Sequence, residues 1–324
     1  MKTIIQEPPF SIQIEFTEGC NLFCDFCGIK GIRKKPGNFK FMLLKDAKII
    51  AKKIRKAKWN SRIEFAMHGE PTANPKFIEM ISVFRRHLPN NQLMITTNGF
   101  GIVRDPLNIV IKMFRAGINV IAIDDYDHNK CSKIIQIKIP KGGKHFYPKE
   151  KKYSPHNRYP KGTNIVIFVE DISKTTTGTH STLNNHCGCA FPALSQPLNK
   201  RCAKPFRELS IRYDGHICIC CNDWQGHYVC GNALDEDIEK IWNNEYFHAA
   251  RQILYANKRD FTPCKWCDAI SYRVGFLPDK MGKKRLPKPT DITYKQAEKA
   301  TAKGTLVRPI KQIKSRKGIK EILK

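Results

Sequence analysis

The sequence has few acidic residues and lacks any long apolar run. It contains 29 Asp and Glu against 57 Lys and Arg, which gives a formal net charge of +28. Such an excess predicts long-range attraction for polyanions: nucleic acid, an acidic peptide or a phosphorylated metabolite. A charge that serves only solubility is the alternative. No apolar stretch approaches the ~18 residues that cross a bilayer, so we expect no membrane-spanning segment.

The sequence also lacks a secretory signal pattern before the first expected strand, yet it contains 13 cysteines. Disulfide frameworks are typical of secreted proteins, so this cysteine usage favours metal ligation in a reducing compartment. We therefore expect a cytoplasmic protein. With 324 residues, 41 % of them hydrophobic, the chain can form one large domain and a smaller one.

Strands and helices are expected to alternate at short intervals in the first part of the chain. The expected strands cover residues 11–16, 62–67, 93–97 and 118–124, and the expected helices cover 43–59, 75–88 and 106–116. This alternation is typical of a parallel sheet with helices outside, and polar motifs follow the strands. The pattern predicts an α/β fold with a partial (β/α)6 TIM-type barrel.

The rhythm weakens after residue 125. Strands are expected at 133–139 and 164–169, and between them residues 141–163 combine basic and aromatic side chains. We expect a surface loop there, with a platform for single-stranded nucleic acid as the alternative.

Three cysteines lie within eight residues directly after the first expected strand. Cys20, Cys24 and Cys27 have the spacing C-x3-C-x2-C. A tetrahedral zinc site uses four ligands, whereas three thiolates suit a [4Fe–4S] cluster with one iron left open for an outside ligand. A partial zinc knuckle or three unrelated buried thiols are the alternatives.

The spacing, together with Phe26 just before the third cysteine, resembles the signature of the radical S-adenosylmethionine (radical SAM) superfamily. The resemblance implies that the three cysteines bind a [4Fe–4S] cluster, that SAM chelates its open iron, and that Phe26 lies by the adenine. The run Gly69-Glu70-Pro71 resembles the family's Gly-Gly-Glu-Pro motif, in which backbone groups and the glutamate hold the amino group of SAM. His68 replaces the first glycine, and its role is left open.

Two further polar motifs follow expected strands. Residues 96–99 read Thr-Thr-Asn-Gly and resemble the family's T-N-G turn, which makes Asn98 a candidate SAM-binding residue. A simple Asn-Gly turn is the alternative. Asp124 and Asp125 end the fourth strand, where the family often contacts the ribose or methionine end of SAM, and Asp124 is the preferred candidate.

The second half of the chain carries more cysteines. Asp214 and Gly215 separate two alternating runs, which predicts a β-hairpin, and a Cys-x2-Cys pair follows an expected helix at 238–242. This order resembles the SPASM/twitch extensions of radical SAM enzymes. The resemblance implies one auxiliary [4Fe–4S] cluster, with Cys221 as a rival to Cys220 and a structural zinc site as the alternative occupant. The expected ligands are Cys202, Cys220, Cys264 and Cys267.

The sequence thus predicts a barrel over residues 1–186, a cysteine-rich α+β module of a hairpin plus helices over 187–278, and a basic tail over 279–324.

The resemblance implies reductive cleavage of SAM to a 5′-deoxyadenosyl radical, which takes hydrogen from a substrate in an oxidation or cross-link assisted by the auxiliary cluster. It also implies an electron donor such as flavodoxin or ferredoxin. The substrate stays open among peptide or protein, metabolite and polyanion. The rival hypothesis is a metal-stabilised nucleic-acid-binding protein without catalysis. Cys187 and Cys189 are expected to be buried thiols, with an extra cluster ligand or hydrogen donor as the alternative.

Overall fold

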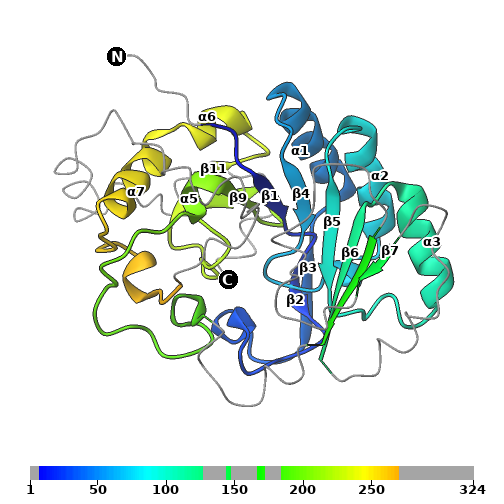
Figure 1. Ribbon diagram of the computed structural model, residues 1–324, viewed down its shortest axis with the longest axis horizontal. Coiled ribbons are helices and arrows are strands. Elements are labelled where there is room, and N and C mark those ends of the chain that lie inside the picture. The colour runs from blue at the N-terminus through cyan, green and yellow to red at the C-terminus, as the bar shows by residue number, and fades with distance from the viewer. Residues whose placement is uncertain (1–6, 127–143, 147–165, 172–183, 270–324) are drawn as a thin grey trace.

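The computed structural model describes residues 7–126, 144–146, 166–171 and 184–269 (Figure 1). The strand expected at 133–139, most of the basic segment 141–163 and the tail lie outside the described residues. No helix in the described part is both long and apolar enough to cross a membrane.

Within the described residues, nine strands form one sheet in the order β11–β10–β9–β1–β4–β5–β6–β8–β7. The barrel part consists of β1 (Ser11–Ile14), β4 (Arg62–Phe65), β5 (Leu93–Thr97), β6 (Val120–Asp125), β8 (Val166–Asp171) and β7 (Lys144–Phe146), all joined by parallel pairing. The predicted partial barrel is confirmed. Its last two strands depart from chain order, because β7 lies outside β8 at the edge of the sheet.

Three helices lie beside the barrel strands in Figure 1: α1 (Leu44–Lys56), α2 (Phe77–His87) and α3 (Pro106–Ala116). Ala47, Ile50 and Ile54 of α1 are fully buried, as their helical spacing predicts. Leu44, the first residue of the helix, is 37 % exposed. The helix α3 begins at a proline and ends at Gly117, whose φ of 104° is the left-handed conformation that a glycine C-cap adopts.

The second module extends the same sheet instead of forming its own. Its strand β9 (Glu208–Ile211) pairs in parallel with β1, and β10 (His216–Cys218) and β11 (Val229–Asn232) continue the sheet in antiparallel order. The predicted hairpin turn at Asp214 and Gly215 joins β9 to β10, with φ 86° at the glycine. The carboxyl end of β9 therefore lies at the same edge as the carboxyl end of β1.

Short helices complete the module: η4 (His186–Gly188), α5 (Lys204–Arg207), α6 (Ile238–Trp242), α7 (Glu245–Tyr255) and η5 (Cys264–Trp266). Asn244 caps α7 by accepting a hydrogen bond from the amide of Phe247. Trp242 is fully buried and meets Trp59 of the barrel edge-on, with ring centroids 6.4 Å apart. The two halves of the chain therefore share one hydrophobic core.

Candidate active site

The polar motifs predicted from the sequence converge at the carboxyl edge of the parallel sheet. The cysteine loop leaves β2 (Thr17–Cys20), which forms a two-stranded ribbon with β3 (Gly37–Phe41), and ends in the turn η1 (Gly28–Gly31). The amide of Gly19 donates to the carbonyl of His68, and the amide of Glu70 donates to the carbonyl of Gly19. The loop after β4 is thus held against the cysteine loop.

Gly69 is required at this contact. A Cβ atom on Gly69 would lie 2.3 Å from the carbonyl oxygens of Thr17 and Gly19. Real Cβ atoms do not approach backbone that closely, so a side chain here would push the two loops apart. The glycine of the Gly-Glu-Pro run therefore has at least a steric role.

Cys20, Cys24 and Cys27 are all half-buried free thiols. The amide of Leu22 donates to Cys20 Sγ at 3.3 Å and the amide of Ile29 to Cys27 Sγ at 3.5 Å. Burial raises the pKa of Cys20 to about 12 and that of Cys27 to about 11. These thiols are therefore protonated without metal, and a metal would have to displace their protons.

Glu70 is the centre of the hydrogen-bond network at this edge. Its Oε1 accepts from the amide and the hydroxyl of Thr72, at 2.9 and 2.5 Å, and from the hydroxyl of Thr97 at 2.5 Å. Its Oε2 accepts from the amide of Asn98 at 2.8 Å. Burial raises the pKa of the Glu70 carboxyl, while the bonds from Thr72, Thr97 and Asn98 oppose that rise. The carboxylate caps η2 (Pro71–Ala73) and ties the loop after β4 to the loop after β5.

Asn98 is more than a turn residue. Its side-chain amide donates to Cys20 Sγ at 3.4 Å and to Asn21 Oδ1 at 2.9 Å, and its Oδ1 accepts from the amide of Phe100 at 2.9 Å. Asn98 therefore joins the T-N-G turn directly to the first cysteine.

Phe26 stacks on Tyr126, with ring centroids 5.7 Å apart and planes inclined by 20°. Tyr126 follows β6, and burial together with Asp124 and the cysteines raises its pKa well above the usual value. Asp124 is half-buried, whereas Asp125 is fully buried. The sequence prediction missed Tyr126, although an aromatic residue directly after a barrel strand was a signal that could have found it.

His68 connects the barrel to the second module. Its Nδ1 lies 3.1 Å from Glu15 Oε1, and its Nε2 lies 2.8 Å from the carbonyl oxygen of Cys221. Its ring packs against Trp224 at 4.5 Å between centroids. The fully buried histidine that replaces the first motif glycine thus orders the boundary between the two halves.

Trp224 also links the second module to the cysteine loop. Its ring packs on Gly28 of the cysteine loop, where a Cβ would lie 2.4 Å from the indole. Its Nε1 donates to His186 Nδ1 at 3.0 Å. Burial, with His68 and Lys204, lowers the pKa of His186 to about 4, so that ring is neutral at pH 7 and can accept the bond.

The four cysteines expected in the second module come together. Burial is the main cause that raises the pKa of Cys264, followed by the neighbouring thiols Cys202 and Cys267. Burial also raises the pKa of Cys220, followed by Cys221, Cys264 and Cys267, while Lys204 opposes the rise. The amide of Ala269 donates to Cys267 Sγ at 3.4 Å, and Asn222 Nδ2 lies 3.8 Å from the same sulfur.

Cys221 occupies a different environment from Cys220. Lys204 Nζ donates to Cys221 Sγ at 3.2 Å and to Glu208 Oε2 at 3.1 Å. Cys221 is therefore held by a buried ion pair, and the geometry favours Cys220 as the fourth thiol of the set.

Cys187 is a fifth thiol at this site. It hydrogen-bonds with Cys267, and that bond is the main reason why the pKa of Cys267 falls to about 6. Cys187 has a φ of 56° and lies in η4, which contacts both η1 and η5. Cys187 was expected to be a buried thiol but is half-buried, and its place beside Cys267 fits the alternative of a thiol at the auxiliary site.

Both thiol sets have the donor chemistry of iron–sulfur sites. Across the ranges that the structure describes, no three His, Cys, Asp or Glu side chains surround a point where a single ion could bind. The thiolates of a [4Fe–4S] cluster bind different irons, so they need not meet at one point. Backbone and side-chain N–H groups aimed at sulfur are also the contacts that tune such clusters.

Two family models match the chain in succession. The radical SAM superfamily model matches residues 14–137, and the SPASM iron–sulfur cluster-binding domain model matches residues 202–268. The chain carries a radical SAM domain followed by a SPASM domain. A radical SAM domain binds a [4Fe–4S] cluster and SAM, and a SPASM domain binds auxiliary iron–sulfur clusters. The zinc alternative and the hypothesis of a non-catalytic binding protein are therefore not supported.

The chain is also similar to two named enzymes and to solved structures. The S-adenosyl-L-methionine-dependent 2-deoxy-scyllo-inosamine dehydrogenase of Niallia circulans is 22 % identical over 269 residues, which span 81 % of this chain and 94 % of that protein. The GTP 3′,8-cyclase of Photorhabdus laumondii is 25 % identical over 114 residues, 35 % of this chain and 33 % of that protein. The crystal structure of BtrN in complex with AdoMet and 2-DOIA aligns with a TM-score of 0.63 at 20 % identity and covers 84 % of this chain and 97 % of that one.

Proposed function

We propose that this radical SAM enzyme is a dehydrogenase, which removes one hydrogen atom from a hydroxyl-bearing carbon of its substrate and then one electron and the proton of that hydroxyl group. In this proposal Cys20, Cys24 and Cys27 hold the SAM-binding cluster. The auxiliary cluster is held by Cys202, Cys220, Cys264 and Cys267. The observation that carries the proposal is that two separate thiol sets lie beside one continuous nine-stranded sheet, joined through His68 and Trp224.

When bound, the first cluster and SAM supply a 5′-deoxyadenosyl radical that takes a hydrogen atom from the substrate. The residues of the barrel edge bind and orient SAM. Glu70 Oε2 accepts only one described hydrogen bond, so it keeps lone pairs for the amino group of SAM. Gly69 brings the backbone close, and Asn98 fixes Cys20 and the turn. Phe26 and Tyr126 offer a stacked aromatic pair by the adenine, with Asp124 beside them at the end of β6.

The auxiliary site suits an electron acceptor. Two cations lie buried next to it: Lys204, which contacts Cys221, and Arg259, which is 1 % exposed and donates to the carbonyl of Ala269 at 2.8 Å. Positive charge near a cluster stabilises its reduced form. An auxiliary cluster held here would supply an acceptor for the second electron of the proposed two-electron oxidation.

The relative's printed activity supports a substrate class. That protein is named as a dehydrogenase of an inosamine, and this chain covers 94 % of its length. We therefore propose a hydroxyl-bearing polar metabolite, oxidised at the carbon that carries the hydroxyl group. The proposed electron donor for the first cluster is a flavodoxin or ferredoxin.

Deuterium transfer tests this function. Anaerobically reconstituted enzyme is incubated with dithionite, SAM and a panel of cyclic amino alcohols deuterated at the carbinol carbon. The proposal predicts deuterium in 5′-deoxyadenosine and a ketone product for at least one substrate. A Cys264→Ala/Cys267→Ala variant should still transfer deuterium but form far less ketone. Deuterium transfer with full ketone formation by that variant contradicts the auxiliary role.

A further inference from the structure

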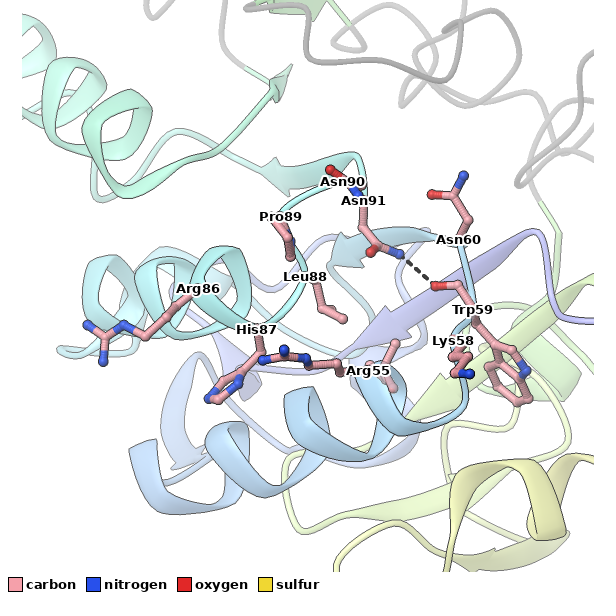
Figure 2. Close-up of a pocket in the computed structure, with 11 residues that line it drawn as sticks. Arg55, Lys58, Trp59, Asn60, Arg86, His87, Leu88, Pro89, Asn90 and Asn91 are labelled. Atoms are coloured by element: carbon pink, nitrogen blue, oxygen red, sulfur yellow. Dashed lines mark hydrogen bonds between the residues drawn. The ribbon is translucent and has the colours of Figure 1, made fainter.

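A concave surface lies at the edge of the sheet opposite the cysteine loops. It is a cavity of about 440 Å³ between the carboxyl ends of α1 and α2 and the loops that enter β4 and β5 (Figure 2). Its lining residues are Ile54, Arg55, Lys58, Trp59, Asn60, Arg86, His87, Leu88, Pro89, Asn90 and Asn91. Because β4 and β5 are parallel, the loops that enter them and the loops that leave them lie at opposite edges. The cavity is therefore separate from the proposed active site.

The surface is basic and has no acidic lining residue. A second hollow next to the cavity is lined by Leu44, Lys45, Lys48, Val83, Arg86 and His87. Lys52 lies between the two hollows on α1. We call the exposed cations Lys45, Lys48, Lys52, Arg55, Lys58 and Arg86 the basic groove. Among the described residues, none of their side chains has an ion pair with a carboxylate.

Four cations of the basic groove act electrostatically on the same side chain, His87. His87 ends α2, and burial lowers its pKa, followed by the charges of Lys52, Arg55, Lys48 and Arg86. Three of these cations come from α1 and one from α2, so their fields overlap between the helices. The imidazole is therefore neutral at pH 7 and available as a hydrogen-bonding group.

The helix dipole does not explain the positions of all the cations in the basic groove. Cations in the last turn of a helix stabilise it, which explains Arg55 and Arg86. Lys45 and Lys48 lie in the first half of α1, where the helix dipole disfavours positive charge. Two other cations of α1 contact the SPASM domain: Lys53 donates to the carbonyl of Glu236, and Lys56 pairs with Asp237. The basic groove is thus distinct from the cations that join α1 to the SPASM domain.

We propose that the basic groove binds the phosphodiester backbone of a single nucleic-acid strand. From Lys45 to Arg55 the row of cations extends about 15 Å along α1, which exceeds a single phosphate group and matches several consecutive phosphates. A concave site takes a thin strand more readily than the surface of a folded acidic protein. The amides of Asn60 and Asn90, exposed at the mouth of the cavity in Figure 2, can hydrogen-bond to sugars or bases.

The test compares two variants with the same net charge. Lys48→Glu/Lys52→Glu/Arg55→Glu changes the groove, and Lys34→Glu/Lys112→Glu/Lys240→Glu changes three exposed lysines elsewhere. Binding of a fluorescein-labelled, mixed-sequence 12-nucleotide RNA to the full chain is followed by anisotropy between 50 and 300 mM salt. The basic segments outside the described residues are common to both proteins. Thermal melting and iron content show that both variants fold, and the corresponding Gln variants replace any that does not.

The groove variant should bind at least ~10-fold more weakly than the control variant, and its slope of log K against log salt should be smaller by about 2. Equal weakening of both variants, or a wild type that does not bind the RNA, overturns the proposal. Displacement of the RNA by millimolar inorganic phosphate points to a single-phosphate site and also overturns it, as does equal displacement by polyglutamate, which points to an acidic protein. SAM cleavage should be unchanged in both variants, so this result is independent of the proposed dehydrogenase activity.

Discussion

The backbone amide of Asn98 donates a 2.8 Å hydrogen bond to the carboxylate of Glu70. This bond joins the loops after β4 and β5, and the side chain of the same asparagine reaches Cys20. The proposed SAM-binding carboxylate and a proposed cluster ligand are therefore two contacts apart. A substitution of Glu70, Asn98 or Cys20 should therefore affect the positions of the other two residues.

Replacing Glu70 by Gln should weaken SAM binding by at least ~10-fold. The amide carries no charge to pair with the amino group of SAM, and its NH2 group faces donors that the carboxylate accepts from. Loss of these bonds should also destabilise the fold by about 1–3 kcal/mol. Glu79→Gln, at an exposed site on α2, is the matched control. Calorimetric titration with SAM and thermal melting measure the two effects, and unchanged SAM affinity in Glu70→Gln contradicts the assignment.

Replacing Asn98 by Ala should lower the reduction potential of the first cluster without loss of iron. The side-chain amide donates to Cys20 Sγ, and hydrogen bonds to cluster sulfurs stabilise the reduced state. An EPR-monitored redox titration measures the shift. Asn108→Ala, on the outer helix α3, should leave the potential at the wild-type value. If both variants titrate like the wild type, Asn98 has only a turn role.

Tyr126 should act through its ring and not through its hydroxyl. Tyr126→Phe keeps the stack on Phe26, whereas Tyr126→Ala removes it. We expect Tyr126→Phe to keep the wild-type KM for SAM, and Tyr126→Ala to raise it several-fold with a smaller effect on kcat. The rate of 5′-deoxyadenosine formation against SAM concentration gives both constants. Equal losses in the two variants point instead to a role of the phenol group.

Glu18 should make stability depend on acid pH. Burial raises its pKa, but Arg212, Arg33 and Lys40 outweigh burial and hold the pKa below the usual value of 4.5. Between the folded pKa and about pH 4.5, the Glu18 carboxyl is therefore protonated more in the unfolded chain than in the folded one. The stabilisation from its ion pairs is present above about pH 4.5 and is lost as pH falls through the folded pKa. Glu18→Gln should unfold about 3 kcal/mol more easily at pH 7. In anaerobic urea titrations this difference should narrow below pH 4.5, and a constant difference contradicts the ion-pair account.

Iron content should distinguish the thiols of the second module. Cys220→Ala should lose about four irons, one cubane, whereas Cys221→Ala should keep them, because Cys221 is engaged with Lys204. Cys187→Ala should also keep its iron and change the auxiliary potential through the lost bond to Cys267. If Cys187→Ala loses iron and Cys220→Ala does not, the ligand set has to be reassigned.

Local patterns predicted much of the fold. The strand β5, the helix α3 and the turn at Asp214 and Gly215 follow from periodicity and turn chemistry, which act within a few residues. The parallel pairing of β9 with β1 could not be predicted in this way, because it joins segments about 200 residues apart. That pairing joins the barrel and the second module in one sheet.

In the candidate site, too, some residues could be found from local sequence patterns and others only from tertiary contacts. The residues of recognisable motifs, such as Glu70 and Cys264, could be named from the sequence, and their ligand roles stay predictions. Tyr126, Cys187 and Lys204 belong to no motif and are placed by tertiary contacts. Sequence spacing carries no information on such contacts.

The central claim is that two separate thiol sets each hold a [4Fe–4S] cluster. The most direct measurement is iron and labile sulfide per chain, prepared anaerobically, in the wild type and in the Cys20→Ala/Cys24→Ala/Cys27→Ala variant. The account predicts about eight irons in the wild type and about four in the variant, since each cubane holds four. About four irons in the wild type and none in the variant would contradict it, because the SPASM domain would then hold no cluster.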